Sequence, residues 1–405
     1  MKLTPGEKLQ SNGFKPSAFP PVKHEHQLSA FYAFMRCVSP LVYDQRLDVW
    51  AVYDYATARR ILTDTAHFSS DLSRVRFPRF LHKDLHLSIL HKDPPIHTAL
   101  RGSVQRFFTP SFLAGFTGFI DTFVQKCLER STDRGYCDIV EHVASPLALT
   151  CALMLLGFPE AEWPQIGRWW SLRKAHSRTR QQYTSLFSEL WSADFDIYLR
   201  SKIDEKFHQP GDDVLSAIIQ THLNSVPLNE QEIIEFVILI LVASQDTTAQ
   251  LVANSVLCLL QYEDVRNKLS RDLGLLKPFL EEVLRYTSPV QGVSRVPTCD
   301  VAIDRAILHA GQEVIVWIGS ANRDESIFER AAEFDLDRKP NPHLAFGMGI
   351  HYCLGAALSS LATQAVLRQL LQSFPHFQLA NQPPLRWSSN PFLSGPAQLP
   401  LQLTK

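Results

Sequence analysis

The segment with the clearest chemistry lies near the C-terminal end and reads Phe346-Gly-Met-Gly-Ile-His-Tyr-Cys353-Leu-Gly355. Gly349 and Gly355 permit a tight turn because they have no side chain, so backbone N–H groups can point at the cysteine sulfur. Those groups favour the thiolate, the form of cysteine that binds metal, and a thiolate is one of the few protein ligands of haem iron. The spacing Phe-x-x-Gly-x-x-x-Cys-x-Gly predicts a haem–thiolate site at Cys353. A buried free cysteine in a glycine-rich loop is the alternative.

A run of polar residues interrupts what is otherwise predicted to be one long apolar helix. Asn229 can cap a helix over about residues 230–263, which contain neither Gly nor Pro and would span roughly 50 Å. In its middle, Ser244-Gln-Asp-Thr-Thr248 interrupts the apolar side chains, and buried polar groups without partners cost free energy. A helix broken at a functional site would supply partners, because Ser and Thr can hydrogen-bond to the carbonyl four residues earlier. One solvent-facing turn is the alternative reading.

Charged residues between and around these segments predict two further clusters. Glu282 and Arg285 are three residues apart on one face of a predicted helix, and Arg338 can complete a buried, charge-assisted network with them. The second cluster would supply the positive groups that a buried dianionic cofactor requires; it comprises His97 and Arg101, four apart on a predicted helix, together with Arg295 and His351.

Composition limits the classes of function. The chain has 405 residues, of which 45% are hydrophobic, including 25 Phe, so it can bury a substantial core. Its net charge of −1 provides no global basic field, so we expect no nucleic-acid partner. The basic residues between Arg168 and Arg180 read as a solvated helix face.

The cysteines indicate a reducing compartment. Seven cysteines are scattered along the chain without a C-x-x-C pair, so neither a disulfide framework nor a zinc site is expected. The first residues lack the apolar core of a signal peptide, and no run reaches about 18 uninterrupted apolar residues. We therefore expect a cytoplasmic protein that does not bind membranes.

The pattern along the chain favours a single, mainly α domain with small β-sheets. We expect a tail over residues 1–20 and one domain over 21–405. Residues 49–53 predict a strand and 55–64 a helix, helical periodicity dominates from about 96 to 285, and 356–371 predict a helix after the cysteine. Short strands are expected between residues 294 and 318 and between 378 and 403.

Taken in order, these segments resemble the cytochrome P450 superfamily, in particular its soluble bacterial members. The resemblance covers nearly the whole chain. It rests on Trp50-Ala-Val-Tyr to Phe68-Ser-Ser-Asp71, Asp93-Pro-Pro-Ile-His97-Thr-Ala-Leu-Arg101, Glu282-x-x-Arg285, Ala321-Asn-Arg-Asp324, Phe334-Asp-Leu-Asp-Arg338, His343-Leu-Ala-Phe346 and the cysteine signature. It implies the P450 fold, a triangular prism whose long central helix crosses the haem.

The resemblance also implies a role for each candidate residue. Cys353 would be the iron ligand, Phe346 would open the haem-binding loop, and His97, Arg101, Arg295 and His351 would bind the propionates of haem b. Glu282, Arg285 and Arg338 would form a structural triad behind the loop. Thr247 would hydrogen-bond the bound dioxygen or a water, and Asp246 would relay protons to it, since the distal oxygen must be protonated before the O–O bond breaks.

Two positions depart from the family pattern. Ser244 stands where the family usually has Gly or Ala, so its hydroxyl could crowd dioxygen, hold a water or contact substrate. Ser360 and Ala362 stand where an Arg and a Glu often follow the cysteine, at the face where a redox partner would dock.

By position, an apolar pocket would surround the reaction site. Residues 69–90 would cover the haem and 163–187 would form a mobile lid. The predicted lining residues are Phe77, Phe80, Leu85, Leu87, Phe236, Ile240, Ala243, Ser244, Val290, Val293 and Phe392. Such a lining predicts a hydrophobic substrate, for example a terpenoid, steroid, fatty acid or polyketide.

The predicted function is that of a haem–thiolate monooxygenase that hydroxylates or epoxidises this substrate with dioxygen. We expect a monomer that receives electrons, originally from NAD(P)H, through a separate ferredoxin and its reductase. A peroxide-driven peroxygenase and a non-catalytic haem–thiolate sensor are the alternatives. The presence of both Asp246 and Thr247 argues against each of them.

Overall fold

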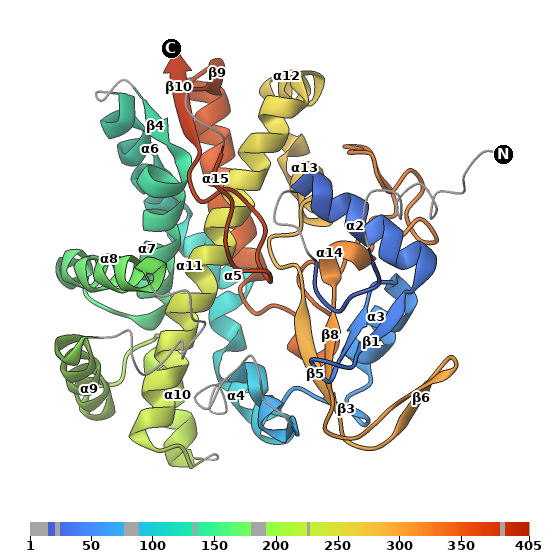
Figure 1. Cartoon of the computed structure of the whole chain (residues 1–405). Coiled ribbons are helices and arrows are strands. Elements are labelled where there is room, and N and C mark those ends of the chain that lie inside the picture. The colour runs from blue at the N-terminus through green and yellow to red at the C-terminus, as the bar shows by residue number, and fades with distance from the viewer. Residues whose placement is uncertain are drawn as a thin grey trace.

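The computed structural model describes residues 15–20, 25–76, 89–132, 136–179, 192–224, 227–380 and 385–404. The chain is helix-rich with small sheets, as predicted (Figure 1). The helices are α2 (Glu25–Val38), α3 (Tyr55–Thr63), α4 (Ile96–Val104), α5 (Pro110–Leu113), α6 (Thr117–Thr132), α7 (Ser145–Leu156), α8 (Trp163–Thr179), α9 (Ala193–His208), α10 (Val214–Asn224), α11 (Glu230–Gln261), α12 (Glu263–Arg271), α13 (Leu276–Tyr286), α14 (Ile318–Ala321) and α15 (Ala356–Ser373).

The strands form three small sheets. The main sheet has the order β1 (Leu41–Asp44), β2 (Val49–Val52), β8 (Glu313–Val316), β5 (Val293–Pro297) and β3 (Phe68–Ser69), with β2 and β8 parallel. A second sheet joins β4 (Cys137–Asp138), β10 (Pro400–Thr404) and β9 (His376–Leu379), and β6 (Val301–Ile303) pairs with β7 (Ala306–Leu308). Strands β2, β5 to β8 and β10 lie in or at the edge of the regions where the sequence predicted strands, and β9 overlaps the last of them. Strands β1, β3 and β4 were not predicted.

Helix α11 crosses the middle of the molecule and separates its two sides. Figure 1 shows α6 to α10 on one side of it and the main sheet with α2, α3 and α14 on the other. Asn229 starts the helix with a reciprocal capping box, in which its side chain accepts from the Glu232 N–H and the Glu232 carboxylate accepts from the Asn229 N–H. The largest core cluster surrounds α11, which packs against α7 and α15.

Two expectations about these elements are corrected. Helix α11 is continuous over all of its 32 residues, so it is not broken at the polar segment. Its hydroxyl side chains bond to carbonyls of the helix itself, which satisfies them without a break. Within the predicted N-terminal tail, Ala18 is fully buried, and its carbonyl accepts from the Trp317 indole N–H at 2.9 Å. Residues around Ala18 therefore belong to the packed body.

Among the described residues, three helical stretches are long and apolar enough to cross a membrane, judged by length and composition alone: residues 96–131, 139–156 and 230–261. None of these stretches was expected as a membrane span from the sequence, because none is an uninterrupted apolar run. In the second and third stretches, 72% and 67% of the most apolar window is buried inside the protein, so core packing accounts for those side chains. In the first stretch 28% is buried, and short 3-10 turns at 105–108 and 114–116 interrupt it.

Candidate active site

The cysteine loop is held in a fixed turn at the start of α15. Gly347 and Gly349 both have φ of +71°, which favours glycine, and a Cβ on Gly349 would lie 2.9 Å from the Leu62 carbonyl oxygen. The Cys353 N–H donates to the Phe346 carbonyl at 2.8 Å, which closes the loop. The conformation that the two glycines permit therefore packs the loop directly on the end of α3.

The sulfur of Cys353 faces a hollow inside the protein. Its side chain is solvent-accessible, yet burial by the surrounding protein raises the pKa of the thiol, while backbone N–H groups of Gly355 and Ala356 and the charge of Arg101 act to lower it. A group that is both accessible and desolvated lies against an internal space rather than on the outer surface. The N–H groups at the start of α15 and the nearby guanidinium favour the thiolate form.

Four basic side chains from three separate elements gather beside this loop. His97 and Arg101 come from α4, Arg295 from β5, and His351 from the 3-10 turn at Gly349–His351. The His97 and His351 rings lie 4.2 Å apart between centroids, and burial together with Arg295, His97 and Arg101 lowers the pKa of His351 to about 2. Burial also lowers the pKa of Arg295 to about 10. Both histidines are therefore neutral without an anion beside them, since the pKa of His97 is lowered as well. The charge of the cluster is that of Arg101 and Arg295, and an anion would stabilise it.

Unpaired polar atoms in this cluster support the need for an anionic partner. His97 Nδ1 and His351 Nε2 are buried and have no hydrogen-bond partner among the residues that the structure describes. The charge of Asp93 acts to raise the pKa of both His97 and Arg295, but the larger effect of burial lowers both values. Asp93 also accepts from Ser69 Oγ at 2.5 Å and from the Ser70 N–H at 3.0 Å, so its carboxylate already has other partners. The cluster has the charge and the free donors to hold a carboxylate-bearing ligand.

The polar segment of α11 presents hydroxyl groups and a small residue together. Ala243 is exposed although it lies in the middle of a helix that crosses the molecule, so it too borders internal space. Thr247 donates its hydroxyl proton to the Ala243 carbonyl at 2.6 Å, and Ser244 donates to Leu241 at 3.2 Å. Gln245 faces away from this side, since it is buried and its amide donates to the Ser145 carbonyl at 3.5 Å.

Behind the cysteine loop, Glu282 lies between two arginines. Arg285 donates to both of its carboxylate oxygens, at 2.8 and 2.7 Å, and Arg338 Nε lies 3.1 Å from one of them. Glu282 is 1% exposed, and the Asn341 amide and the Asp335 N–H donate to it as well. Arg285 uses its other N–H groups on carbonyls of 322, 331 and 333. This network ties α13 to the chain that leads into the loop.

Comparison with known proteins identifies the family. The Cytochrome P450 family model matches residues 170–401. Cytochrome P450 109 of Bacillus spizizenii is 31% identical over 99% of this chain and 96% of its own length. The chain belongs to the cytochrome P450 family. The P450 monooxygenase PikC of Streptomyces venezuelae is 33% identical over 88% of this chain. The crystal structure of CYP109E1 from Bacillus megaterium with testosterone superposes with a TM-score of 0.82 at 31% identity, covering 93% of this chain and 98% of that one.

As a member of this family the chain is a P450 monooxygenase, and the family implies a haem cofactor and dioxygen. The residues present fit a haem on two counts. The accessible, desolvated sulfur of Cys353 borders the same interior as the basic cluster, since Arg101 is close enough to shift the pKa of that thiol. The orphaned nitrogens of His97 and His351 suit the propionate groups that a haem carries.

The pocket residues predicted for this P450 divide into three groups. Phe77, Phe80, Leu85 and Leu87 lie outside the described residues, as does part of the predicted lid. Ala243 is exposed, and Ile240, Ser244, Val290 and Val293 are partly exposed. Phe236 is buried and Phe392 is partly exposed, so their place in the pocket stays a prediction. Phe236 is 3% exposed, and Phe392 stacks on Trp317 with centroids 5.6 Å apart.

Sequence reasoning assigned no role to the residues that connect the triad to the cysteine loop. Asn322 accepts the Leu344 N–H at 2.6 Å, two residues before Phe346, and its own carbonyl accepts from Arg285. Two residues further on, Asp324 accepts the Tyr55 N–H at the start of α3. The segment Ala321-Asn-Arg-Asp324 was noted only as part of the resemblance. A single Asn or Asp gives no pattern from which such partners could be predicted.

Proposed function

We propose that this P450 inserts one oxygen atom of dioxygen into a C–H or double bond of an apolar molecule of polyketide or steroid size. The single observation that carries the proposal is the accessible, desolvated sulfur of Cys353 beside a buried basic cluster. When bound, the haem supplies dioxygen activation and transfer of one oxygen atom to carbon. The protein's own residues must then hold it, exclude water and deliver protons.

In this proposal Cys353 holds the iron and the basic cluster holds the propionates. The N–H groups at the start of α15 act against the rise in pKa and would stabilise the thiolate once it binds iron, and a thiolate ligand favours O–O cleavage. Arg101 and Arg295 would exchange mutual repulsion for ion pairs with two carboxylates, and the unpaired nitrogens of His97 and His351 would gain hydrogen bonds. That exchange would stabilise the loaded protein relative to the empty one.

Proton delivery is assigned to Thr247 and Asp246. Because the Thr247 hydroxyl gives its proton to the Ala243 carbonyl, its lone pairs stay free to accept a hydrogen bond within the hollow. Thr247 would thereby orient a proton-bearing group there, and Asp246, the residue before it, would relay protons to Thr247. Ser244 donates to Leu241 in the same way, so it adds a second acceptor on this side of the helix.

The relatives support the substrate class. The curated relative PksS of Bacillus subtilis is named as a polyketide biosynthesis P450, and CYP109E1 is solved with testosterone and with corticosterone. Ala243, Ile240, Val290 and Val293 give this chain a small, apolar wall. We further propose that the protein is a cytoplasmic monomer that receives electrons from a separate ferredoxin.

Spectroscopy tests the ligand assignment. Reduced protein with carbon monoxide should show the thiolate-type Soret band, and Cys353→Ala should lose it completely. Cys299→Ala, which removes an exposed cysteine elsewhere, is the matched control and should keep it. An unchanged band in Cys353→Ala would refute the assignment.

Turnover assays test the reaction class. Product formation with surrogate ferredoxin partners and NADPH, compared with peroxide alone, separates a monooxygenase from a peroxygenase. Tight ligand binding without turnover in either assay would indicate a sensor.

A further inference from the structure

A cavity separate from the candidate active site lies on the side of α7 away from α11. It is formed by α6, by the π-helical segment Ile139–Ala144, by α7 and by the start of α8, and its volume is about 570 Å³. This is within the range of pockets that take small molecules. We call this cavity the α6–α7 groove.

Helix α7 separates the groove from the candidate active site. On one side α7 packs against α11, where the Gln245 amide donates to the Ser145 carbonyl. On the other side it presents Pro146, Leu149 and Leu153 to the groove. A molecule in the groove would therefore not contact Ala243 or Cys353, and binding there can be measured independently.

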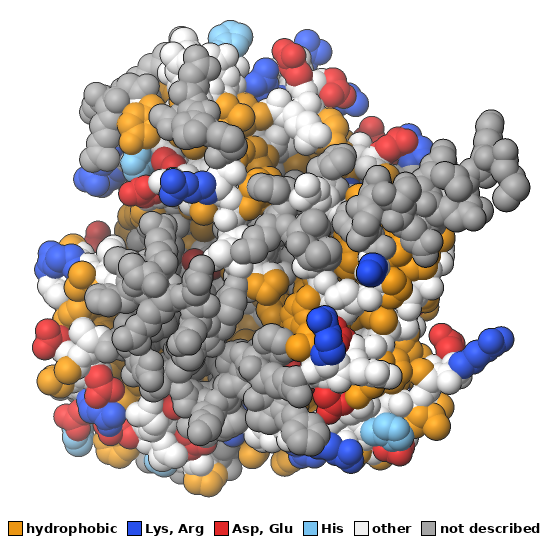
Figure 2. Space-filling model, in the orientation of Figure 1, with side chains coloured by type: hydrophobic (Ala, Val, Ile, Leu, Met, Phe, Trp, Pro, Cys, Tyr) orange, Lys and Arg blue, Asp and Glu red, His pale blue; other side chains and the backbone are white. Residues whose placement is uncertain are grey.

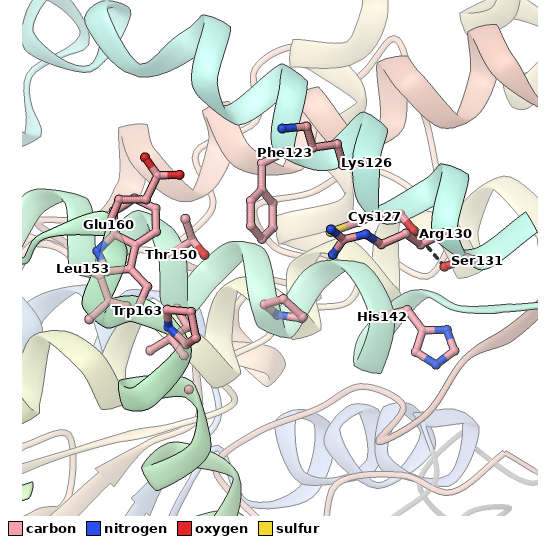
Figure 3. A pocket seen from close by; sticks show the side chains of 14 residues that line it. Phe123, Lys126, Cys127, Arg130, Ser131, His142, Thr150, Leu153, Glu160 and Trp163 are labelled. Atoms are coloured by element: carbon pink, nitrogen blue, oxygen red, sulfur yellow. Dashed lines mark hydrogen bonds between the residues drawn. The ribbon is translucent and has the colours of Figure 1, made fainter.

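The middle of the groove is apolar. Phe123 of α6, Leu149 and Leu153 of α7, and Trp163 at the start of α8 line it together. Phe119 packs edge-on against Trp163 at 5.6 Å between centroids, which fixes the indole at that end. Figure 3 shows Phe123 between the two ends of the cavity. This surface suits a hydrocarbon chain, which would be removed from water there.

The two ends of the groove carry opposite charge. Lys126 and Arg130 stand one turn apart on α6, and within the part of the chain that the structure describes neither has an ion-pair partner. His142 lies at the same end, and since its Nδ1 accepts the Asp138 N–H at 3.1 Å, a neutral ring carries its proton on Nε2 and can donate. Glu160 lies at the opposite end (Figure 3).

We propose that the α6–α7 groove binds a long-chain carboxylate of the fatty-acid class, as a site separate from the haem pocket. The carboxylate lies at the Lys126 and Arg130 end, where these two cations, which have no ion-pair partner among the described residues, bind it. Glu160 repels it from the other end and so sets its direction. The chain lies along Phe123, Leu153 and Trp163.

Calorimetric titration of the haem-loaded protein with dodecanoate tests the site. The haem pocket is first saturated with an imidazole-type ligand of the iron, so that the probe cannot bind there. We expect one saturable site. Dodecanol, which has the same chain without the charge, should bind at least about tenfold more weakly, because charge-assisted hydrogen bonds are lost. Dodecyltrimethylammonium should bind more weakly still.

Charge reversal locates the carboxylate. The double variant Lys126→Glu/Arg130→Glu should weaken dodecanoate binding at least about tenfold. Both side chains are exposed, so the fold should tolerate the change. The matched control is Lys268→Glu/Arg271→Glu on α12, which makes the same change of net charge at exposed positions away from the groove and should leave affinity unchanged.

A steric variant locates the chain. Gly167 lines the groove, and a Cβ placed on it meets no atom within 4 Å, so Gly167→Leu should fill the cavity without disturbing α8. It should abolish dodecanoate binding. Gly118→Leu, at an equally open glycine of α6 outside the groove, should not. No saturable binding of dodecanoate, equal affinity for the three probes, or equal affinity in the groove variants and their controls would overturn the proposal.

Discussion

Thr247 and Thr248 of α11 carry the same hydroxyl group but lie in different surroundings. Thr247 is partly exposed on the side of Ala243 and bonds back to that residue, whereas Thr248 is buried on the other side of the helix. Both have the same chemistry and almost the same position in the sequence. Of these two threonines, Thr247 is the one on the side of Ala243, which supports the proton-handling role proposed for it.

Replacing Thr247 by Val keeps the shape of the side chain and removes the hydroxyl. We expect Thr247→Val to consume NADPH at a similar rate but to convert at least about tenfold less of it into product, with peroxide released instead, because a positioned proton-transfer group contributes about 10²–10⁴-fold. Product formed per NADPH consumed is the measurement. Thr248→Val is the control and should remain coupled. Equal coupling in both variants would show that protons take another route.

Between elements, the Glu282 network fixes how α13 meets the segment before the cysteine loop. The carboxylate joins Arg285 of its own helix to Arg338, 53 residues further along the chain from Arg285, through bonds of 2.7–3.2 Å. Neither Glu282 nor Arg285 reaches solvent. A network of this kind adds little net stability when complete, but losing one member leaves the others buried without a counter-charge.

Removing the charge of Glu282 should therefore be costly. Glu282→Gln should lower the free energy of unfolding by about 3–5 kcal/mol, because two buried guanidinium groups lose their counter-charge. Urea unfolding and haem content of the purified protein are the measurements. The neighbouring Glu281→Gln is the control, since Glu281 is 42% exposed and pairs only with His343. A loss of less than about 1 kcal/mol in Glu282→Gln would mean that the arginines find other partners.

The Glu281–His343 pair predicts a small dependence of stability on pH. The hydrogen bond from His343, 3.0 Å long, lowers the pKa of the Glu281 carboxyl. The unfolded chain then binds more protons than the folded one as pH falls below the ordinary glutamate pKa of about 4.3. The stabilisation is present above that pH and is lost as pH falls through the lowered pKa.

Glu281→Gln should reveal this contribution. At pH 6 the variant should be less stable than the wild type by only ~0.5 kcal/mol, because the pair is partly exposed. The difference should shrink toward zero as the pH is lowered to about 3. Urea midpoints across this pH range are the measurement. A difference that grows on acidification would give the wrong sign and contradict the assignment.

Across the whole molecule, Asn254 of α11 holds together segments that are far apart in sequence. Its buried amide donates to the Thr287 carbonyl at 2.8 Å, just after α13, and to the Ser394 carbonyl at 3.0 Å, near the C-terminal end. Gly395 lies so close that a Cβ on it would overlap Gln250. This contact brings the last loop against the central helix. It thereby connects the side that carries the main sheet to the helical side.

Asn254→Leu should test the importance of this contact. It leaves two buried carbonyl groups without donors, so we expect the free energy of unfolding to fall by about 2–4 kcal/mol. The measurement is thermal or urea unfolding. Asn267→Leu, at an exposed position of α12, is the matched control and should change stability by less than about 0.5 kcal/mol. Similar losses in both variants would place the effect in helix propensity instead.

Charge over the surface is balanced at this scale. On the face shown in Figure 2, acidic and basic side chains are interspersed, in keeping with the net charge of −1. The near-zero net charge was already known from the sequence.

Much of this protein was determined by the sequence alone, because local interactions carry the information. Gly349, one of the two glycines expected to form the turn of the cysteine loop, has a positive φ, as does Gly347. Gly355, the other expected glycine, has φ of −81° at the start of α15. The start of α11 needs an Asn with a Glu three residues later, and Asn229 and Glu232 form that cap. Most of the strands and the helix-rich class followed from periodicity for the same reason.

Only the tertiary structure decided which side chains meet, because burial and like-charge crowding depend on residues hundreds of positions apart. His97 and His351 come within 4.2 Å, and Arg295 joins them, through the packing of three separate elements. Phe236 and Phe392 match the apolar pattern of a pocket wall equally well, yet Phe236 is a buried core residue and Phe392 is partly exposed beside the core. The sequence supplied the chemistry of each group, and packing supplied its surroundings.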